Sequence, residues 1–161
     1  TLFTLRNGLA SELAAGRGFS YAEKLMFVGH DQLAPMHRHR TKVEDIIVRW
    51  APPGAGLALE LWPDGPGGPQ RGRPVTVLCD GALRTTGQDG LLVLHPGESV
   101  TLTPDVWHAF WGRGGDVVVG EVSSVNDDWD DNVFEDDIPR FPAIEDDVPA
   151  RTALVCERAR P

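Results

Sequence analysis

Short runs of β-branched and other apolar residues dominate the pattern of hydrophobic positions from residue 21 onward. Clusters of Gly, Pro, Asp and Asn separate these runs, which are EKLMFVG, DIIVRW, LALELW, VTVLCD, GLLVLH, SVTLTP and DVVVGEV. Short β-prone runs bounded by turn residues are typical of strands. Because no helical pattern lies between them, the sequence predicts an all-β, antiparallel sandwich or barrel over residues 21–161.

The first 20 residues have a different pattern. The segment LASELAAG places Leu9 and Leu13 four residues apart, and Gly16 and Gly18 follow as helix-ending glycines. We therefore expect a short helix and turn over residues 1–20, leading into the strands of a single domain.

Two later segments lack a strand pattern. The run from Pro63 to Pro74, PDGPGGPQRGRP, predicts an exposed connection between two strands because it is rich in Gly and Pro. After Val125 the chain is acidic and interrupted by prolines before a last strand-like run, RTALVCE. We expect this acidic C-terminal segment to wrap the barrel or to cover its mouth.

Composition and charge narrow the class of partner. The 161 residues suit one domain, and the formal net charge is −9, with acids concentrated between Asp127 and Asp147. Such a charge disfavours nucleic acid, whose binding requires clustered Lys and Arg. No run approaches the roughly 20 apolar residues of a membrane span, so we expect no membrane partner and a soluble, cytoplasmic protein. A neutral sugar is a compatible small-molecule substrate.

Four residues form a candidate metal site. His37 and His39 lie two apart in PMHRHR, and such residues in an extended segment point to the same face, about 7 Å apart at the backbone. Glu44 opens the run EDIIV, so a tight turn between adjacent strands would return its carboxylate to the imidazoles. His108, in LTPDVWHAFWG, is expected at the end of a strand that sheet closure brings to the same place.

Nitrogen and carboxylate ligands without thiolate suit a divalent ion such as Mn²⁺, Fe²⁺, Co²⁺, Ni²⁺ or Zn²⁺. Four protein ligands on a six-coordinate ion leave two positions for substrate oxygens. An isolated HxH pair also fits a solvated strand, and Arg38 and Arg40 beside the histidines fit an ordinary polar surface.

The same motifs carry a family resemblance. HxHxxxxE, followed by PxxxH after a PGE turn, resembles the cupin superfamily. The segments YAEKLMFVGHDQLAPMHRHRTKVEDIIV, LTPDVWHAFWG and GEVSSVNDDWDDNVF resemble the D-lyxose isomerase family, from about Tyr21 to Pro149. Two short motifs are more specific than a general cupin signature: KxEDII, from Lys42 to Ile47, and EVSxVNDD, from Glu121 to Asp128.

The resemblance implies a cupin-type antiparallel β-barrel (jelly roll) and a cytoplasmic, usually homodimeric enzyme. It implies that the enzyme interconverts D-lyxose with D-xylulose, and often D-mannose with D-fructose, through an enediol, with Mn²⁺ as the common ion. The metal ligands would be His37, His39, Glu44 and His108. Arg38 and Arg40 stand where the family pattern has aromatic residues, and residues 48–52 replace an Asn-Arg-Gly-Gly-Gly run. Because these positions adjoin the metal ligands in sequence, we expect them to affect sugar preference.

Two residues are candidates for catalysis. Lys42 lies between the ligands His39 and Glu44, and it would contact substrate oxygens or relay a proton. Glu121 shares strand parity with Val117 and Val119, so it points inward if those valines do. A solvated turn lysine and an exposed strand-end glutamate are the alternatives.

Other residues are candidates for contacting the sugar. Phe110 shares the face of His108, whereas Trp107 lies on the opposite face. In the acidic segment, Asp127, Asp131 and Asn132 could bind sugar hydroxyls, although a charge-rich run is more often a solvated face. The resemblance implies that Arg140, a further sugar contact, and Glu145 close the mouth. The competing functions are a cupin dioxygenase, which would use the same ligands with Fe²⁺ and O₂, and a non-catalytic sugar-binding cupin.

Overall fold

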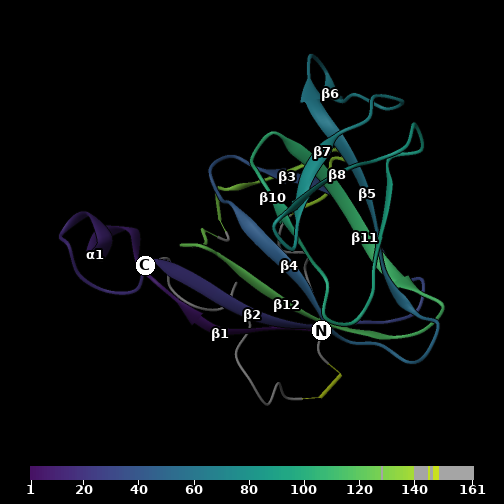
Figure 1. Cartoon of the computed structure of the whole chain (residues 1–161). Helices are drawn as coiled ribbons and strands as arrows, with labels where there is room; N and C mark the ends of the chain where they lie inside the picture. Colours follow the sequence, from purple (N-terminus) through teal and green to yellow (C-terminus); the bar gives the residue numbers. More distant parts are fainter. Residues whose placement is uncertain (128, 140–144, 146, 149–161) are drawn as a thin grey trace.

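Strands make up most of the fold. The computed structural model describes residues 1–127, 129–139, 145, 147 and 148 (Figure 1). Its elements are β1 (Leu2–Asn7), α1 (Ala10–Ala14), β2 (Tyr21–Val28), β3 (Ala34–His39), β4 (Glu44–Trp50), β5 (Gly56–Gly65), β6 (Gly68–Pro69), β7 (Thr76–Cys79), β8 (Ala82–Thr85), β9 (Leu91–Leu94), β10 (Ser99–Leu102), β11 (Val106–Arg113), β12 (Val117–Ser124) and β13 (Asn132–Phe134).

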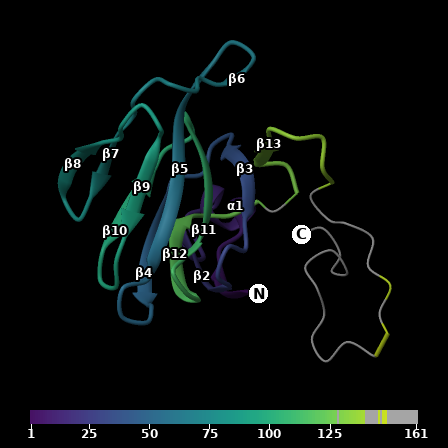
Figure 2. The same ribbon diagram turned by 90° about the vertical axis from the view of Figure 1, so that its right-hand side faces the viewer.

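The strands form two antiparallel sheets that face each other. One has the order β1-β2-β12-β4-β10-β7-β8, and the other has the order β13-β3-β11-β5-β6, with β9 pairing to β5. In the second view β13 lies beside β3, on the opposite side of the molecule from the β7–β8 hairpin (Figure 2). The expected all-β antiparallel barrel of the cupin type is confirmed.

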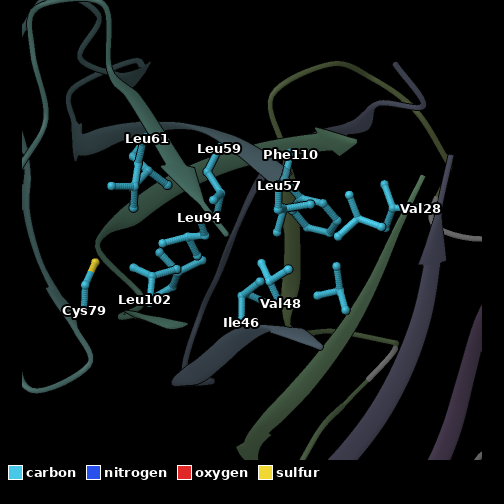
Figure 3. Packing of buried hydrophobic residues seen from close by; sticks show 14 of the residues in the cluster. Val28, Ile46, Val48, Leu57, Leu59, Leu61, Cys79, Leu94, Leu102 and Phe110 are labelled. Atoms are coloured by element: carbon cyan, nitrogen blue, oxygen red, sulfur yellow. The ribbon is translucent and has the colours of Figure 1, made fainter. Parts of the chain in front are cut away.

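The core lies between the two sheets because alternate residues of each strand point inward. Leu57, Leu59 and Leu61 of β5 are all fully buried, and Leu94 of β9 and Phe110 of β11 belong to the same cluster. Their side chains interdigitate between the ribbons of the two sheets (Figure 3). The alternation of apolar and polar residues that predicts these strands therefore also identifies which side chains form the core.

The start of the chain differs from the expected helix and turn. Residues Leu2–Asn7 form a strand, β1, that pairs antiparallel with β2, and only Ala10–Ala14 are helical. Helix α1 stands away from the sheets, beyond the ends of β1 and β2 (Figure 1). The helical prediction holds for five residues, whereas β1 has too exposed a pattern for hydrophobic spacing to identify it.

Two other predictions concern the connecting segments. The Gly- and Pro-rich segment after Pro63 contains the short hairpin between β5 and β6. The acidic segment crosses beside β3, where Asn132–Phe134 form β13. The predicted final strand, RTALVCE, lies outside the described residues. In the described part of the chain, no helix is long and apolar enough to cross a membrane.

Candidate active site

The paired histidines project from β3 toward β11. His37 and His39 are two residues apart in β3, so both side chains point to the same face, and β13 covers the free edge of β3. His108 is the direct partner of His37 in the β3–β11 ladder. It lies near the start of β11 rather than at the end of a strand, which differs from the prediction. The ladder still brings it to the other two histidines, as expected.

Glu44 completes this cluster from the opposite sheet. It is the first residue of β4, and its Oε1 lies 3.1 Å from His108 Nε2 and 3.4 Å from His39 Nε2. The Nε2 atoms of His37 and His108 are 3.1 Å apart. One ligand atom from each of the three histidines falls within a single 4.8 Å cluster, so the group can hold a divalent metal ion.

The tautomers of the imidazoles fit a cation at the centre. His37 Nδ1 lies 2.7 Å from the carbonyl oxygen of Pro35, and His108 Nδ1 lies 3.1 Å from that of Val106. An acceptor at Nδ1 places the proton there and leaves a lone pair on Nε2. Nitrogen lone pairs therefore converge with a carboxylate oxygen.

The local charges favour the same protonation states. Burial, together with the positive charge that His108 would carry, holds the pKa of His37 well below its ordinary value, so this imidazole is neutral. Burial raises the pKa of Glu44, but the neighbouring Lys42 ammonium and the two imidazoles outweigh it and hold this pKa well below its ordinary value. Neutral imidazoles and an ionised carboxylate are the forms that bind metal.

A second charged group adjoins the ligands. Lys42 Nζ lies 2.7 Å from Glu44 Oε2 and donates a 2.9 Å hydrogen bond to Glu121 Oε1. Burial lowers the pKa of Lys42, but the carboxylates of Glu44 and Glu121 outweigh it, and the pKa is raised. Glu121 points inward with Val117 and Val119, all three being buried, so its predicted orientation is observed.

Lys24 also belongs to this cluster, although the sequence analysis did not identify it. It lies in β2 directly opposite Glu121 of β12, and its Nζ is 3.1 Å from Glu121 Oε1. Its exposed fraction is only 4%. Lys24 shares parity with the buried residues Met26 and Val28, and this spacing was the signal that could have revealed it.

Apart from His108, the residues of this cluster line one cavity of about 280 Å³. Phe110, as predicted, contributes to its wall, together with Phe134 of β13, whose ring centroid lies 5.6 Å from that of His37. Asn132 also lines the cavity, so β13 brings two described residues of the acidic segment, Asn132 and Phe134, to its wall. The other described residues of the wall are mainly apolar, among them Met26, Val28, Leu33, Ala34 and Ile46.

Asp131 lies behind the histidines instead of facing the cavity. Its Oδ1 accepts hydrogen bonds from the backbone N–H and the hydroxyl of Thr41, at 2.8 and 2.9 Å. Its Oδ2 lies 2.9 Å from His39 Nδ1. The Asp131 carboxylate therefore lies beside His39 and is not among the residues that line the cavity. Arg140, the other predicted sugar contact from this segment, lies outside the described residues.

The arginines that depart from the family pattern point away from the cavity. Arg38 alternates with His37 and His39, and its guanidinium lies 5.5 Å from the centre of the Trp107 ring and 3.4 Å from Asp64. Arg40 donates to the backbone oxygen of Asp130. Neither arginine, nor any of residues 48–52, lines the cavity. These residues therefore adjoin the metal ligands in sequence but have no place on the cavity wall.

An antiparallel two-sheet barrel with an HxH pair, a glutamate and a third histidine inside it defines a cupin-type protein with a cluster that could hold a metal ion. The family model for D-lyxose isomerase matches residues 1–158. A D-lyxose/D-mannose isomerase of Escherichia coli O157:H7 is 43% identical over 159 residues, which is 98% of this chain and 68% of the relative. A D-lyxose/D-mannose isomerase of Serratia proteamaculans is 44% identical over 162 residues, which is 99% of this chain and 69% of the relative.

The chain therefore belongs to the D-lyxose isomerase family, and it is an enzyme of the sugar isomerase class. A solved structure with a similar fold is the L-ribose isomerase of Cellulomonas parahominis with L-ribose, at a TM-score of 0.57 and 19% identity, covering 85% of this chain and 69% of the other. At this identity the likeness concerns the fold alone. The family resemblance predicted from the short motifs is confirmed.

Proposed function

We propose that the chain is a metal-dependent aldose–ketose isomerase that interconverts D-lyxose with D-xylulose, and D-mannose with D-fructose, through an enediol. The names of the two relatives support this choice of sugars. The observation that carries the proposal is the shared cavity, in which a cation-binding cluster adjoins a carboxylate flanked by two ammonium groups.

His37, His39, Glu44 and His108 would hold the ion, which we propose to be Mn²⁺. Their donors are nitrogen and carboxylate oxygen, a set that suits the divalent ions of the first transition series. When bound, the ion supplies positive charge that polarises the sugar carbonyl and favours loss of the neighbouring proton. Asp131 would support His39, because its Oδ2 lies 2.9 Å from His39 Nδ1.

Glu121 would move the proton between C2 and C1 of the sugar. Both of its ion pairs, with Lys24 and Lys42, use Oε1, which leaves Oε2 for the substrate proton. Lys42 would donate a hydrogen bond to a substrate oxygen, because it lies between Glu121 and the ligand Glu44. General acid–base help of this kind contributes about 10²- to 10⁴-fold in rate.

The apolar wall would position the sugar and exclude water. Phe110 and Phe134 offer ring faces to the C–H groups of the sugar. Asn132 would bind a hydroxyl at the mouth. A cavity of about 280 Å³ lies near the lower limit for ligand pockets, about 300 Å³, which suits a monosaccharide better than a longer saccharide.

The test is turnover by protein stripped of metal and reconstituted with one divalent ion at a time. D-lyxose, D-mannose and D-xylulose are incubated with each preparation, and the sugar products are quantified by chromatography. We expect isomerisation with Mn²⁺ and none in the stripped protein. Absence of turnover with every divalent ion would refute the proposal, and oxygen consumption would favour a dioxygenase.

We also propose that the enzyme is a cytoplasmic homodimer, which is what the family resemblance implies. Light scattering coupled to size-exclusion chromatography tests the dimer, because the molar mass is measured directly. A mass of about one chain, near the 17.5 kDa of the sequence, would contradict it.

A further inference from the structure

Asn126 contacts the catalytic cluster from behind. It belongs to the motif Glu121–Asp128, within which Glu121 alone has a role in the proposed reaction. Asn126 follows β12, its exposed fraction is 7%, and its Oδ1 accepts a 2.8 Å hydrogen bond from Lys24 Nζ. Because the same ammonium lies 3.1 Å from Glu121 Oε1, Lys24 is held between a neutral amide and a carboxylate.

The backbone of Asn126 is fixed in turn by the N-terminal strand. Asn7, the last residue of β1, donates from Nδ2 to the Asn126 carbonyl oxygen at 2.9 Å. The Asn126 backbone N–H donates to Asn7 Oδ1 at 3.0 Å. This pair of hydrogen bonds joins residues 119 apart in sequence. It fixes the position of the Asn126 backbone and therefore limits where the Asn126 side chain can lie.

We propose that Asn126 is a positioning residue that holds Lys24 against one oxygen of Glu121. The inference rests on the proposed role of Glu121 in proton transfer. A lysine side chain is flexible and has many accessible rotamers. Without the amide, the Lys24 ammonium is free to pair with Oε2, the oxygen that must receive the substrate proton. Asn126 thus keeps Oε2 available.

A second observation separates this role from a stabilising one. The Asn126 Nδ2 atom is buried and has no hydrogen-bond partner among the described residues. A buried donor without a partner costs free energy of folding. A leucine of similar volume removes that cost but also removes an acceptor of the buried Lys24 ammonium, so the two effects on stability oppose each other, whereas a positioning residue would be missed in the reaction.

The experiment compares Asn126→Leu with the wild-type enzyme in the Mn²⁺-reconstituted form. We expect kcat for D-lyxose to fall by roughly 10²-fold, the effect of misplacing a reacting group by about 1 Å. The KM, the Mn²⁺ affinity and the free energy of unfolding should be retained. Gln88→Leu, an exposed amide outside the cavity, is the matched control and should keep wild-type kcat.

A second variant tests the electrostatic part. Asn126→Asp keeps an acceptor for Lys24 but adds a negative charge near Glu121. A like charge disfavours the ionised form of a carboxyl group, so the acid limb of the kcat/KM profile should move to higher pH. The charged groups that face Glu121, namely Lys24 from β2, Lys42 from the β3–β4 turn and Glu44 from β4, are unchanged in this variant.

Nuclear magnetic resonance gives a readout that does not depend on turnover. The sequence has only two lysines, Lys24 and Lys42, so lysine labelled with ¹⁵N and ¹³C gives two assignable ammonium signals in Zn²⁺-loaded protein. In Asn126→Leu the Lys24 signal should shift and exchange faster, whereas the Lys42 signal should not.

The outcomes are distinguishable. Wild-type kcat in Asn126→Leu, or joint loss of kcat, stability and Mn²⁺ affinity, would overturn the positioning role. If the wild-type enzyme forms no ketose, the proposed function fails, and an unchanged Lys24 signal in the variant would then reject the contact with Asn126 as well.

Discussion

The two ends of the barrel interior differ sharply although the same strands build both. At one end β4 contributes Glu44, β12 contributes Glu121 and β2 contributes Lys24. Two residues further along the inward face, each strand has changed to an aliphatic or thioether side chain: Ile46, Val119 and Met26. A strand therefore passes from charged to apolar within about 7 Å.

This difference indicates that one end of the barrel interior stabilises the fold and that the other end carries the chemistry. Aliphatic side chains such as Leu57 and Leu94 are removed from water at one end, which favours folding. Burying charged groups at the other end costs free energy unless they are paired. Lys24, Lys42, Glu44 and Glu121 pair with one another. Substitutions at the charged end should consequently alter chemistry, and substitutions at the apolar end should alter stability.

Glu121→Gln should give the largest effect on chemistry. The amide keeps the shape of the side chain but cannot accept the C2 proton, so kcat should fall by about 10²- to 10⁴-fold. Mn²⁺ affinity should be retained, because Glu121 does not contact the histidines in the structure. Steady-state kinetics and a metal-competition titration measure the two quantities. Unchanged kcat would assign proton transfer to another group.

Leu94→Ala should give the opposite result at the apolar end. Leu94 is fully buried and lies opposite Leu57 in the β5–β9 ladder, so the substitution leaves a cavity and should cost about 2–5 kcal/mol of unfolding free energy. Urea denaturation measures this loss. Below the unfolding transition, kcat per folded molecule should equal the wild-type value, and a large fall would show that the two ends are coupled.

Asp131→Ala should have an intermediate effect that is confined to the metal. Removing a carboxylate behind a metal-binding histidine typically lowers metal affinity 10- to 100-fold. A competition titration with a chelating dye measures the change in Mn²⁺ affinity. Asp131→Asn separates charge from shape, because an amide oxygen can still accept the hydrogen bonds from Thr41. Wild-type affinity in both variants would remove Asp131 from the support of His39.

Arg38→Phe should give the smallest effect. It restores the aromatic residue of the family pattern on the outer face, where the contacts of the arginine with Trp107, Asp64 and the His39 carbonyl oxygen are lost. We expect an unfolding free energy within about 1 kcal/mol of wild type, the size of an exposed cation–π contact. The ratio of kcat/KM for D-lyxose to that for D-mannose should not change. A changed ratio would mean that the outer face controls sugar preference.

The part of the site that local spacing defines was predictable from the sequence. The i, i+2 rule places His37 and His39 on one face, and strand parity places Glu121 inward. Lys24 was missed because its role depends on the β2–β12 ladder, which pairs it with a residue 97 positions away. Local spacing specifies which side chains share a face, but not which strands become neighbours.

Asp131 and β1 show two further limits. Asp131 lies beside a strand of only three residues, too short for a periodic signal, so its charge suggested a solvated loop or a sugar contact. Strand β1 is exposed along its whole length, and hydrophobic alternation is absent where no face is buried. Both segments are positioned by pairing with a distant strand, which is a property of the folded sheet.

The location of the two lysines affects how readily reducing sugars, the substrate class of this enzyme, can react with the protein. Open-chain reducing sugars condense with free amines to give Schiff bases. Both lysine side chains of this sequence lie inside the barrel, each in contact with a carboxylate. Among the residues that the structure describes, the outer surface therefore offers no ε-amino group for glycation.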